Sequence, residues 1–293
     1  MSKVAKLVTD QFIDMLENGM VDGKWQPCWN RGMSMPRNAS TGNNYRGINT
    51  LLLWAAQQKH GYKHSVWATF KQWKAMGHKL VNAKGRGKMI VFWKIVEREQ
   101  TASDGSTEKS TFPFMRYSTV FNCEHAEGYE VPSLPDSLSE SERLSAIDSA
   151  IANTGANIVH GGDTACFIPN RDRIHMPLFE TFHNAHGYYA TAFHELAHWT
   201  GHKSRLDRDL SGRFGSHAYG MEELVAELSA AFTCAEFGFD SITRDDHLKY
   251  IKGWLEKIKE DHTAIITAAS KAAQASEYIL NGAASKAAQA KAA

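Results

Sequence analysis

The chain has 293 residues, of which 43% are hydrophobic and eight are Trp, and its net charge is +1; this length predicts two domains with packed cores. Its four cysteines form no C-x-x-C pair, which argues against a disulfide framework and for a reducing compartment. The segment from Met1 to Glu17 carries acidic residues that exclude a signal peptide, and no apolar stretch reaches the length of a transmembrane helix. We therefore expect a cytoplasmic protein with no membrane partner.

The charge is unevenly distributed along the chain. Residues 1–130 contain 18 Lys+Arg and 11 Asp+Glu, a net charge of +7, whereas the remainder contains 15 and 21, a net charge of −6. The stretch from Tyr129 to Ser141 is rich in Pro, Ser and acidic residues, which is typical of a linker. We therefore predict an α+β protein with a domain over 1–130, a linker over 131–142 and a second domain over 143–293. The charge difference indicates an acidic partner for the first domain.

Hydrophobic periodicity predicts the elements of the first half. Helical spacing is found in three segments, 3–18, 48–60 and 67–76. An apolar run predicts a strand over 89–96, and residues 114–122 predict the strand that returns. Between these strands we expect a charged, polar hairpin tip over 97–112.

The first half also combines aromatic and basic residues in a way that is typical of single-stranded nucleic-acid binding. These residues lie in the loop from Asn43 to Asn49 and in the glycine-containing turn from Lys84 to Lys88, which leads into Trp93. Bases stack on aromatic rings for about 1–3 kcal/mol each, while cations follow the phosphate backbone. The candidate DNA-binding residues are Tyr45, Arg46, Asn49, Lys84, Arg86, Lys88 and Trp93. In the alternative interpretation, most Trp residues are core and the lysines form a solvated face.

In the second half, the segments 165–168 and 173–176 predict two short strands joined by a turn. Zincin folds hold an extended peptide against such an edge by main-chain pairing, so this hairpin is a candidate substrate edge. His175 lies on the second strand, and we interpret it as an ordinary strand residue rather than a functional one.

The most specific motif is His194-Glu195-Leu196-Ala197-His198, an H-E-x-x-H pattern in a segment of good helix formers. Histidines four residues apart lie on one helix face, so both imidazoles can bind one Zn²⁺ ion. Glu195 lies beside that face, where it can accept a proton from water at the metal and act as general base. Gly201 is expected to end the helix. The alternative is a pair of packed core histidines.

The third ligand decides the class of zinc site. A metzincin would place a histidine at position 204, which is Ser204 here, so that class is excluded. The helix predicted over 220–232 resembles the second helix of gluzincins, in which a glutamate binds the metal. We assign Glu223 as the ligand and Glu227, one turn later, as the residue that supports a ligand histidine. The reverse assignment stays open, as does a solvated acidic helix face.

Two further features complete the second half. An oxyanion-stabilising group is expected near the metal, and Tyr188, His217 and Tyr219 are unranked candidates. The segment after Thr263 is rich in Ala, Lys and Gln, which predicts either a solvent-facing helix or a frayed tail. Zn²⁺ is the expected metal, although another divalent ion would suit the same ligands.

Four segments resemble the ArdC-type antirestriction proteins of conjugative plasmids. They are Gly42 through Leu53, T-F-K-Q-W-K from Thr69, H-E-L-A-H-W-T-G-H from His194, and E-E-L-V-A-E from Glu222. The first half also resembles the amino-terminal region of plasmid TraC-type primases. The resemblance implies an N-terminal domain that binds single-stranded DNA and a C-terminal zincin-like metallopeptidase domain. It also implies a role in protecting incoming plasmid DNA from host restriction.

These features leave two functions open. In the first, the protein is a zinc metallopeptidase that is recruited to single-stranded DNA and cuts a protein substrate in the recipient cell. In the second, it is a DNA-coating protein whose zincin domain is structural or catalytically silent. A nuclease is the weakest interpretation, because H-E-x-x-H chemistry is overwhelmingly amide hydrolysis.

Overall fold

The computed structural model describes residues 3–17, 20–21, 24–25, 33–101, 107–132, 139–212, 216–239 and 248–282. Its helices are α1 (Lys3–Glu17), α2 (Ile48–His60), α3 (Phe70–Ala75), α4 (Glu140–Thr154), α5 (Ala185–Thr200), α6 (His217–Glu236), α7 (Leu248–Glu260) and α8 (Ala264–Asn281). Its strands are β1 (Met20–Val21), β2 (Lys24–Trp25), β3 (Arg37–Asn38), β4 (Val66–Thr69), β5 (Lys88–Thr101), β6 (Thr107–Asn122), β7 (Asn157–His160), β8 (Cys166–Ile168) and β9 (Arg173–Met176). The predicted α+β class is confirmed, as are the helices expected over 3–18 and 48–60.

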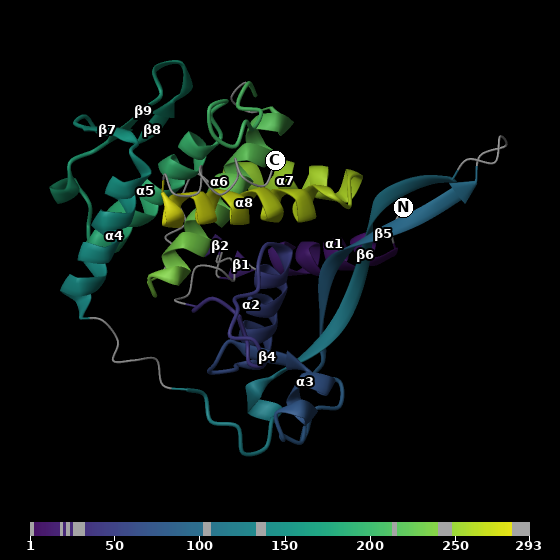
Figure 1. Ribbon diagram of the computed structural model, residues 1–293. Coiled ribbons are helices and arrows are strands. Elements are labelled where there is room, and N and C mark those ends of the chain that lie inside the picture. The colour runs from purple at the N-terminus through teal and green to yellow at the C-terminus, as the bar shows by residue number, and fades with distance from the viewer. Residues whose placement is uncertain are drawn as a thin grey trace.

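A four-stranded sheet with the order β3-β4-β6-β5 organises the N-terminal half. Strands β5 and β6 pair antiparallel from Lys88 opposite Val120 to Thr101 opposite Thr107, and they extend as a ribbon away from the body of the molecule (Figure 1). The strands expected over 89–96 and 114–122 are confirmed. The polar tip expected over 97–112 is wrong, because most of that segment is paired strand and only 102–106 lies outside the described residues. Backbone pairing does not depend on apolar side chains, so a strand of charged residues shows no hydrophobic pattern in the sequence.

The short helix expected over 67–76 begins later than predicted. Trp67 and Ala68 are fully buried and pair with β6 as part of β4. Helix α3 starts only after Thr69, whose hydroxyl accepts from the backbone N–H of Gln72, while the Gln72 side chain accepts from the Thr69 N–H. This capping box fixes the boundary between strand and helix.

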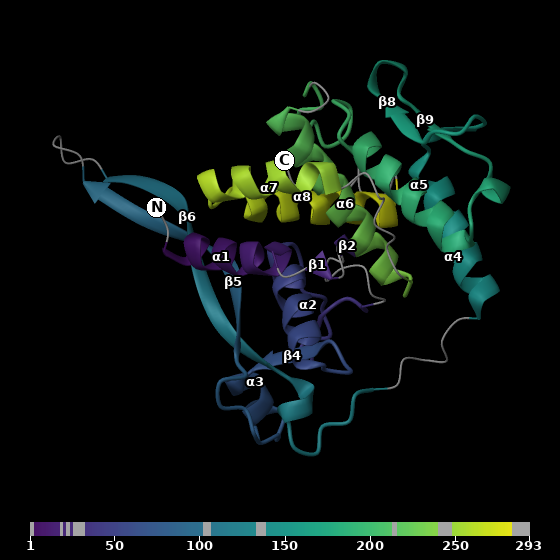
Figure 2. The same ribbon diagram turned by 180° about the vertical axis from the view of Figure 1, so that it is seen from behind.

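The largest hydrophobic core joins the two halves of the chain. Phe12 of α1 and Trp54 of α2 belong to the same buried cluster as Phe232 of α6 and Ile265 of α8. The rings of Trp54 and Phe232 lie 5.7 Å apart. Helices α1 and α2 therefore pack against the helices of the C-terminal half, as Figures 1 and 2 show.

The expectation of a solvent-facing helix or a tail after Thr263 is wrong for the described residues. Helix α8 is a core helix that packs on α4, α5 and α6, and its Ile265, Ala269, Ala272 and Ile279 are fully buried. Its polar residues fall on one face, and alanine on the other face lets the helices approach closely. Alanine content alone cannot distinguish such a face from a solvated one. Residues 283–293 lie outside the described part of the chain.

The C-terminal half carries a three-stranded sheet with the order β7-β9-β8. Strand β7 runs parallel to β9, and β8 runs antiparallel to it, so the two strands predicted over 165–176 are confirmed. Helix α4 begins at Glu140 behind the capping residue Ser139, so the last part of the predicted linker is helical, while 133–138 lies outside the described residues. Among the described helices, none has the length and apolarity that a membrane span requires.

Candidate metal centre

Two neighbouring helices carry the candidate site. Helix α5 begins at the capping residue Asn184, whose side chain accepts from the Gly187 N–H at 2.8 Å, and it ends before Gly201 as predicted. Helix α6 is capped by Ser216. Ala226 and Ala230 on α6 are buried, and such small side chains let two helices approach closely. The H-E-x-x-H face of α5 therefore meets the acidic face of α6.

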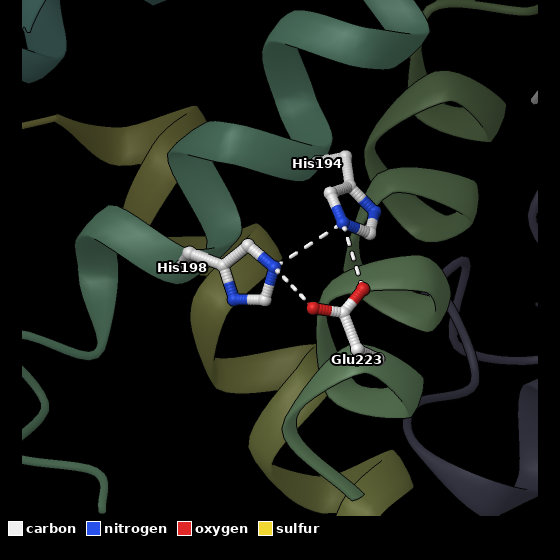
Figure 3. Close-up of side chains that lie close together, drawn as sticks. All are labelled: His194, His198 and Glu223. Atoms are coloured by element: carbon white, nitrogen blue, oxygen red, sulfur yellow. Dashed lines mark hydrogen bonds and ion pairs between the residues drawn. The ribbon is translucent and has the colours of Figure 1, made fainter. Parts of the chain in front are cut away.

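The structure brings the three predicted ligands together, with their donor atoms facing one another (Figure 3). Nε2 of His194 lies 3.2 Å from Nε2 of His198. The Glu223 carboxylate lies 3.5 Å from Nε2 of His194 and 3.4 Å from Nε2 of His198. Both histidines therefore face a carboxylate and each other.

These separations fit a four-coordinate ion. Ligand bonds of about 2.0–2.1 Å in a tetrahedron place neighbouring donor atoms about 3.3–3.4 Å apart. The two Nε2 atoms lie 3.2 Å apart, and each has a different Glu223 oxygen beside it, Oε2 next to His194 and Oε1 next to His198. Two imidazoles and one carboxylate supply three donors, so one position is left for water or substrate. The donor set suits Zn²⁺ and also other divalent ions such as Mn²⁺.

Two further glutamates of α6 face the outer nitrogens of the ligand histidines. Nδ1 of His198 donates to Oε1 of Glu222 at 3.4 Å, and Nδ1 of His194 lies 3.8 Å from Oε2 of Glu227. Such carboxylates orient ligand imidazoles. Glu227 lies where the sequence predicted a supporting residue. Glu222 was not predicted, because it does not belong to the i, i+4 pair formed by Glu223 and Glu227.

Burial and charge shift the pKa values of this cluster strongly. Burial lowers the pKa of His198, but its bonds to Glu222 and Glu223 outweigh burial and raise that pKa to about 10. Burial raises the pKa of Glu223, but the bonds from both histidines dominate and hold it well below its ordinary value. The His198 imidazole and the Glu223 carboxylate therefore stabilise each other's charged form in this buried cluster.

Glu195, the candidate general base, is only 3% exposed and lies on α5, which packs on β8 and β9. Burial raises the pKa of the Cys166 thiol on β8, and the charge of Glu195 raises it further. Strand β8 is an edge strand of its sheet, and the helix that carries Glu195 packs against this strand. His175 pairs with Cys166 in the strand register.

The three oxyanion candidates lie in different places. The hydroxyl of Tyr188 forms a hydrogen bond with Nε2 of His160 at 2.8 Å. Tyr219 lies on α6, one turn before Glu223 and on the same helix face. The side chain of His217 lies outside the described part of the structure. Position on the helix therefore favours Tyr219.

The loop residues proposed for DNA binding make contacts within the protein. The Tyr45 hydroxyl accepts from Nδ2 of Asn38 at 2.9 Å. The Asn49 side chain binds both backbone groups of Val91, at 2.7 and 2.8 Å. Arg46 pairs with Glu277 of α8 at 3.0 Å. These contacts tie the loop to β5 and to the C-terminal half.

The basic turn from Lys84 to Lys88 lies at the surface, beside the end of α2. Lys84 and Arg86 are exposed, and burial together with the charges of Lys59 and Arg86 lowers the pKa of Lys88. Arg86 also donates to Nδ1 of His60 at 2.7 Å. The turn and the end of α2 therefore form a basic cluster of Lys59, Lys84, Arg86 and Lys88.

The described aromatic side chains of the first half divide into buried and exposed ones. Trp67 and Trp73 are core residues, as the alternative interpretation held for most Trp. The side chain of Trp93 lies outside the described part of the structure. Its neighbour Phe92 and Tyr117 on the ribbon are 45% and 60% exposed, and Phe92 lies opposite exposed Arg116 in the strand register. Phe92 shares a strand face with Lys88, at the end of the basic turn.

Comparisons with known proteins find a family model that matches each half of the chain. A model of the N-terminal domain of the anti-restriction factor ArdC matches residues 2–121, and a model of zincin-like metallopeptidases matches residues 145–271. An uncharacterised protein of Sinorhizobium fredii, y4eC, is 40% identical over 93% of this chain and 90% of its own length. A DNA primase TraC of Escherichia coli is 36% identical over 93% of this chain, which corresponds to 26% of the primase.

Solved structures extend the likeness to three dimensions. The metal-free crystal structure of the antirestriction protein ArdC from plasmid R388 is 34% identical and has a TM-score of 0.80, covering 97% of this chain and 99% of that one. Its Mn(II)-bound structure has a TM-score of 0.76 at the same identity, covering 95% and 97%. With matches that span nearly the whole chain in sequence and in structure, this protein belongs to the ArdC family of antirestriction proteins.

Proposed function

We propose that this protein protects incoming plasmid DNA from restriction by binding it as a single strand, and that its second half carries a divalent-metal peptidase site. The observation that carries the peptidase site is the convergence of His194, His198 and Glu223, whose donor atoms approach one another to within 3.2–3.5 Å, with Glu195 on the same helix as the histidines. Zn²⁺ is our proposed metal. Mn(II) in the related ArdC structure supports a divalent ion without selecting zinc.

The site residues would divide the work of amide hydrolysis. His194, His198 and Glu223 would hold the ion, which when bound supplies a Lewis acid beside the scissile carbonyl. The free edge of β8 would pair with an extended peptide and place its carbonyl near Glu195. Glu195 would accept a proton from the attacking water and deliver it to the leaving amine. Tyr219 is the best placed donor to the developing oxyanion.

The basic cluster and the ribbon would hold single-stranded DNA. The charges of Lys59 and Arg86 lower the pKa of Lys88, so these cations lie close enough to repel one another, and an anion bound among them would relieve that repulsion. Phe92 and Arg116 lie on the same face of the ribbon as Lys88. Such an arrangement offers stacking surfaces beside phosphate contacts.

Glu195→Gln distinguishes a protease from a coating protein. The change keeps the size and the metal ligands but removes the base, so peptide hydrolysis should fall by about 10²-fold or more. If proteolysis carries protection, conjugative transfer into a restricting recipient should fall with it. If coating carries protection, transfer should stay at the wild-type level.

The control for this experiment is metal content. Glu195→Gln should retain one equivalent of metal and wild-type DNA affinity, whereas His194→Ala should lose the metal. Wild-type protein that binds neither zinc nor manganese would refute the metal site.

A further inference from the structure

Arg208 is a buried arginine that connects three parts of the site. It is 8% exposed and lies in the segment between α5 and α6. Its Nε and Nη2 atoms donate to the two oxygens of Glu222, at 3.1 and 2.7 Å. Its Nη1 donates to Oγ1 of Thr200 at 2.9 Å, and its Nη2 also donates to the carbonyl of Ala197 at 2.6 Å. The guanidinium therefore spans the end of α5 and the acidic face of α6.

The end of α5 explains why a donor is needed there. The N–H of Gly201 turns to the carbonyl of His198, at 2.8 Å, instead of continuing the helical bond to Ala197. The carbonyl of Ala197, just before the ligand His198, then accepts from Arg208 and from the Thr200 hydroxyl. Buried carbonyls require such partners.

The segment that carries Arg208 is closely packed against the helix end. A Cβ at Gly201 would lie 2.9 Å from Leu210 and 3.0 Å from the Arg208 guanidinium. The backbone returns through Asp207, which has a φ of +46°, and the N–H of Arg208 bonds to the carbonyl of Gly201 at 2.9 Å. Asp tolerates this left-handed conformation better than most residues. The Arg208 side chain therefore lies against the end of α5, where it reaches Ala197 and Thr200.

We propose that Arg208 and Glu222 are positioning residues that fix the imidazole of His198 with Nε2 toward the metal. This inference rests on the proposed metal site. Arg208 holds both oxygens of Glu222, and Oε1 of Glu222 accepts from Nδ1 of His198. An imidazole that donates from Nδ1 presents the lone pair of Nε2 to a metal, in the place where His194 and Glu223 converge.

Glu222→Gln and Arg208→Lys test the proposal in the full-length protein. The first change keeps an acceptor oxygen but removes its charge, and the second keeps the charge but loses the fork geometry. The matched control is Arg205→Gln. Arg205 lies in the same segment, and its side chain is 4% exposed, as is the side chain of Arg208. Arg205 contacts Trp199 and Asp172 instead.

Zinc affinity of the apoproteins, measured by competition with a chromogenic chelator, is the readout. Glu222→Gln should weaken zinc binding by about 10–100-fold, because loss of an outer-shell partner typically has that effect. Arg208→Lys should weaken it in the same direction, and the double variant should lose less than the sum of both effects. Arg205→Gln should bind zinc like the wild type. Thermal unfolding of each apoprotein, together with the Co²⁺ absorption spectrum, separates a displaced ligand from a lost fold.

Three outcomes would overturn the positioning role of Arg208 and Glu222. Wild-type zinc affinity in folded Glu222→Gln and Arg208→Lys would overturn the positioning role while leaving the metal site intact. Equal weakening by Arg205→Gln would show that any buried arginine of the segment matters and would also overturn it. Wild-type protein without zinc affinity would refute the proposed metal site itself, and this inference with it.

Discussion

At the residue scale, three glutamates of α6 face different nitrogen atoms of two histidines. Glu223 faces both Nε2 atoms, while Glu222 and Glu227 face the two Nδ1 atoms. A buried carboxylate is costly unless it is paired, and each of these carboxylates has an imidazole or a guanidinium beside it. These pairings therefore compensate the three buried carboxylates where α5 meets α6.

Tyr45 provides a prediction at this scale. Burial raises its pKa to about 12, although its bond with Asn38 lowers it somewhat. An unfolded Tyr ionises near pH 10, so between pH 10 and 12 only the unfolded state releases the proton. The stability that the neutral phenol contributes is present below pH 10 and is lost as pH rises toward 12.

Tyr45→Phe removes this group from the titration. The wild type should lose about 1 kcal/mol more of its free energy of unfolding than Tyr45→Phe between pH 9 and pH 11. Urea unfolding of both proteins at the two pH values measures the difference. Equal losses in both proteins would mean that the phenol is not shielded from water in solution.

At the element scale, α8 decides how the two halves fit together. One face of this helix carries small alanines against α6, and the other carries Thr267, Lys271, Gln274 and Glu277 toward solvent. Helix α6 carries the glutamates of the candidate metal site, and α8 packs against α6. Arg46 and Asn44 reach across from the first half to Glu277 and Glu236.

Ala272 and Gln274 of α8 form a matched pair for a test of this packing. Ala272 is 0% exposed, so Ala272→Leu should overpack the contact and lower the free energy of unfolding by about 1–3 kcal/mol. Gln274 is exposed, and Gln274→Leu should change it by less than about 0.5 kcal/mol. Chemical unfolding measures both. Similar effects of the two substitutions would contradict a core role for α8.

At the scale of the whole molecule, the two halves have opposite net charges but share one core. Residues 1–130 carry +7 and the remainder −6, so the charge that would attract DNA is confined to one side of the sequence. Because Phe12 and Trp54 pack among residues of α6 and α8, the first half on its own would expose a large apolar surface. DNA binding is therefore best measured on the full chain.

The distribution of charge gives the prediction at this scale. Binding of a single strand should weaken steeply with salt, and its logarithmic slope should fall by about 0.7 for each phosphate contact removed. The double variant Arg86→Gln with Lys88→Gln should reduce affinity and slope, because both residues belong to the basic cluster. Lys271→Gln, an exposed change on α8, should alter neither. Fluorescence anisotropy with a labelled oligonucleotide across a salt series provides the measurement.

The sequence by itself determined the elements and the candidate ligands that follow from local spacing. His194 and His198 had to share a helix face because they lie four residues apart, and Glu223 was proposed as the third ligand from the next amphipathic helix. Helices α1 and α2 and the strands of both hairpins followed from hydrophobic periodicity. These features depend on neighbours within one turn or one strand, so spacing carries them.

The tertiary structure alone decided what depends on packing between distant segments. Arg208 reaches Glu222 only because the segment after Gly201 folds back under α5. Composition could not show that α8 is buried, since alanine fits a solvated face and a tight helix contact equally well. Nor could it show that the two halves share a core. Such contacts join residues far apart in the chain, where no periodic pattern records which surfaces meet.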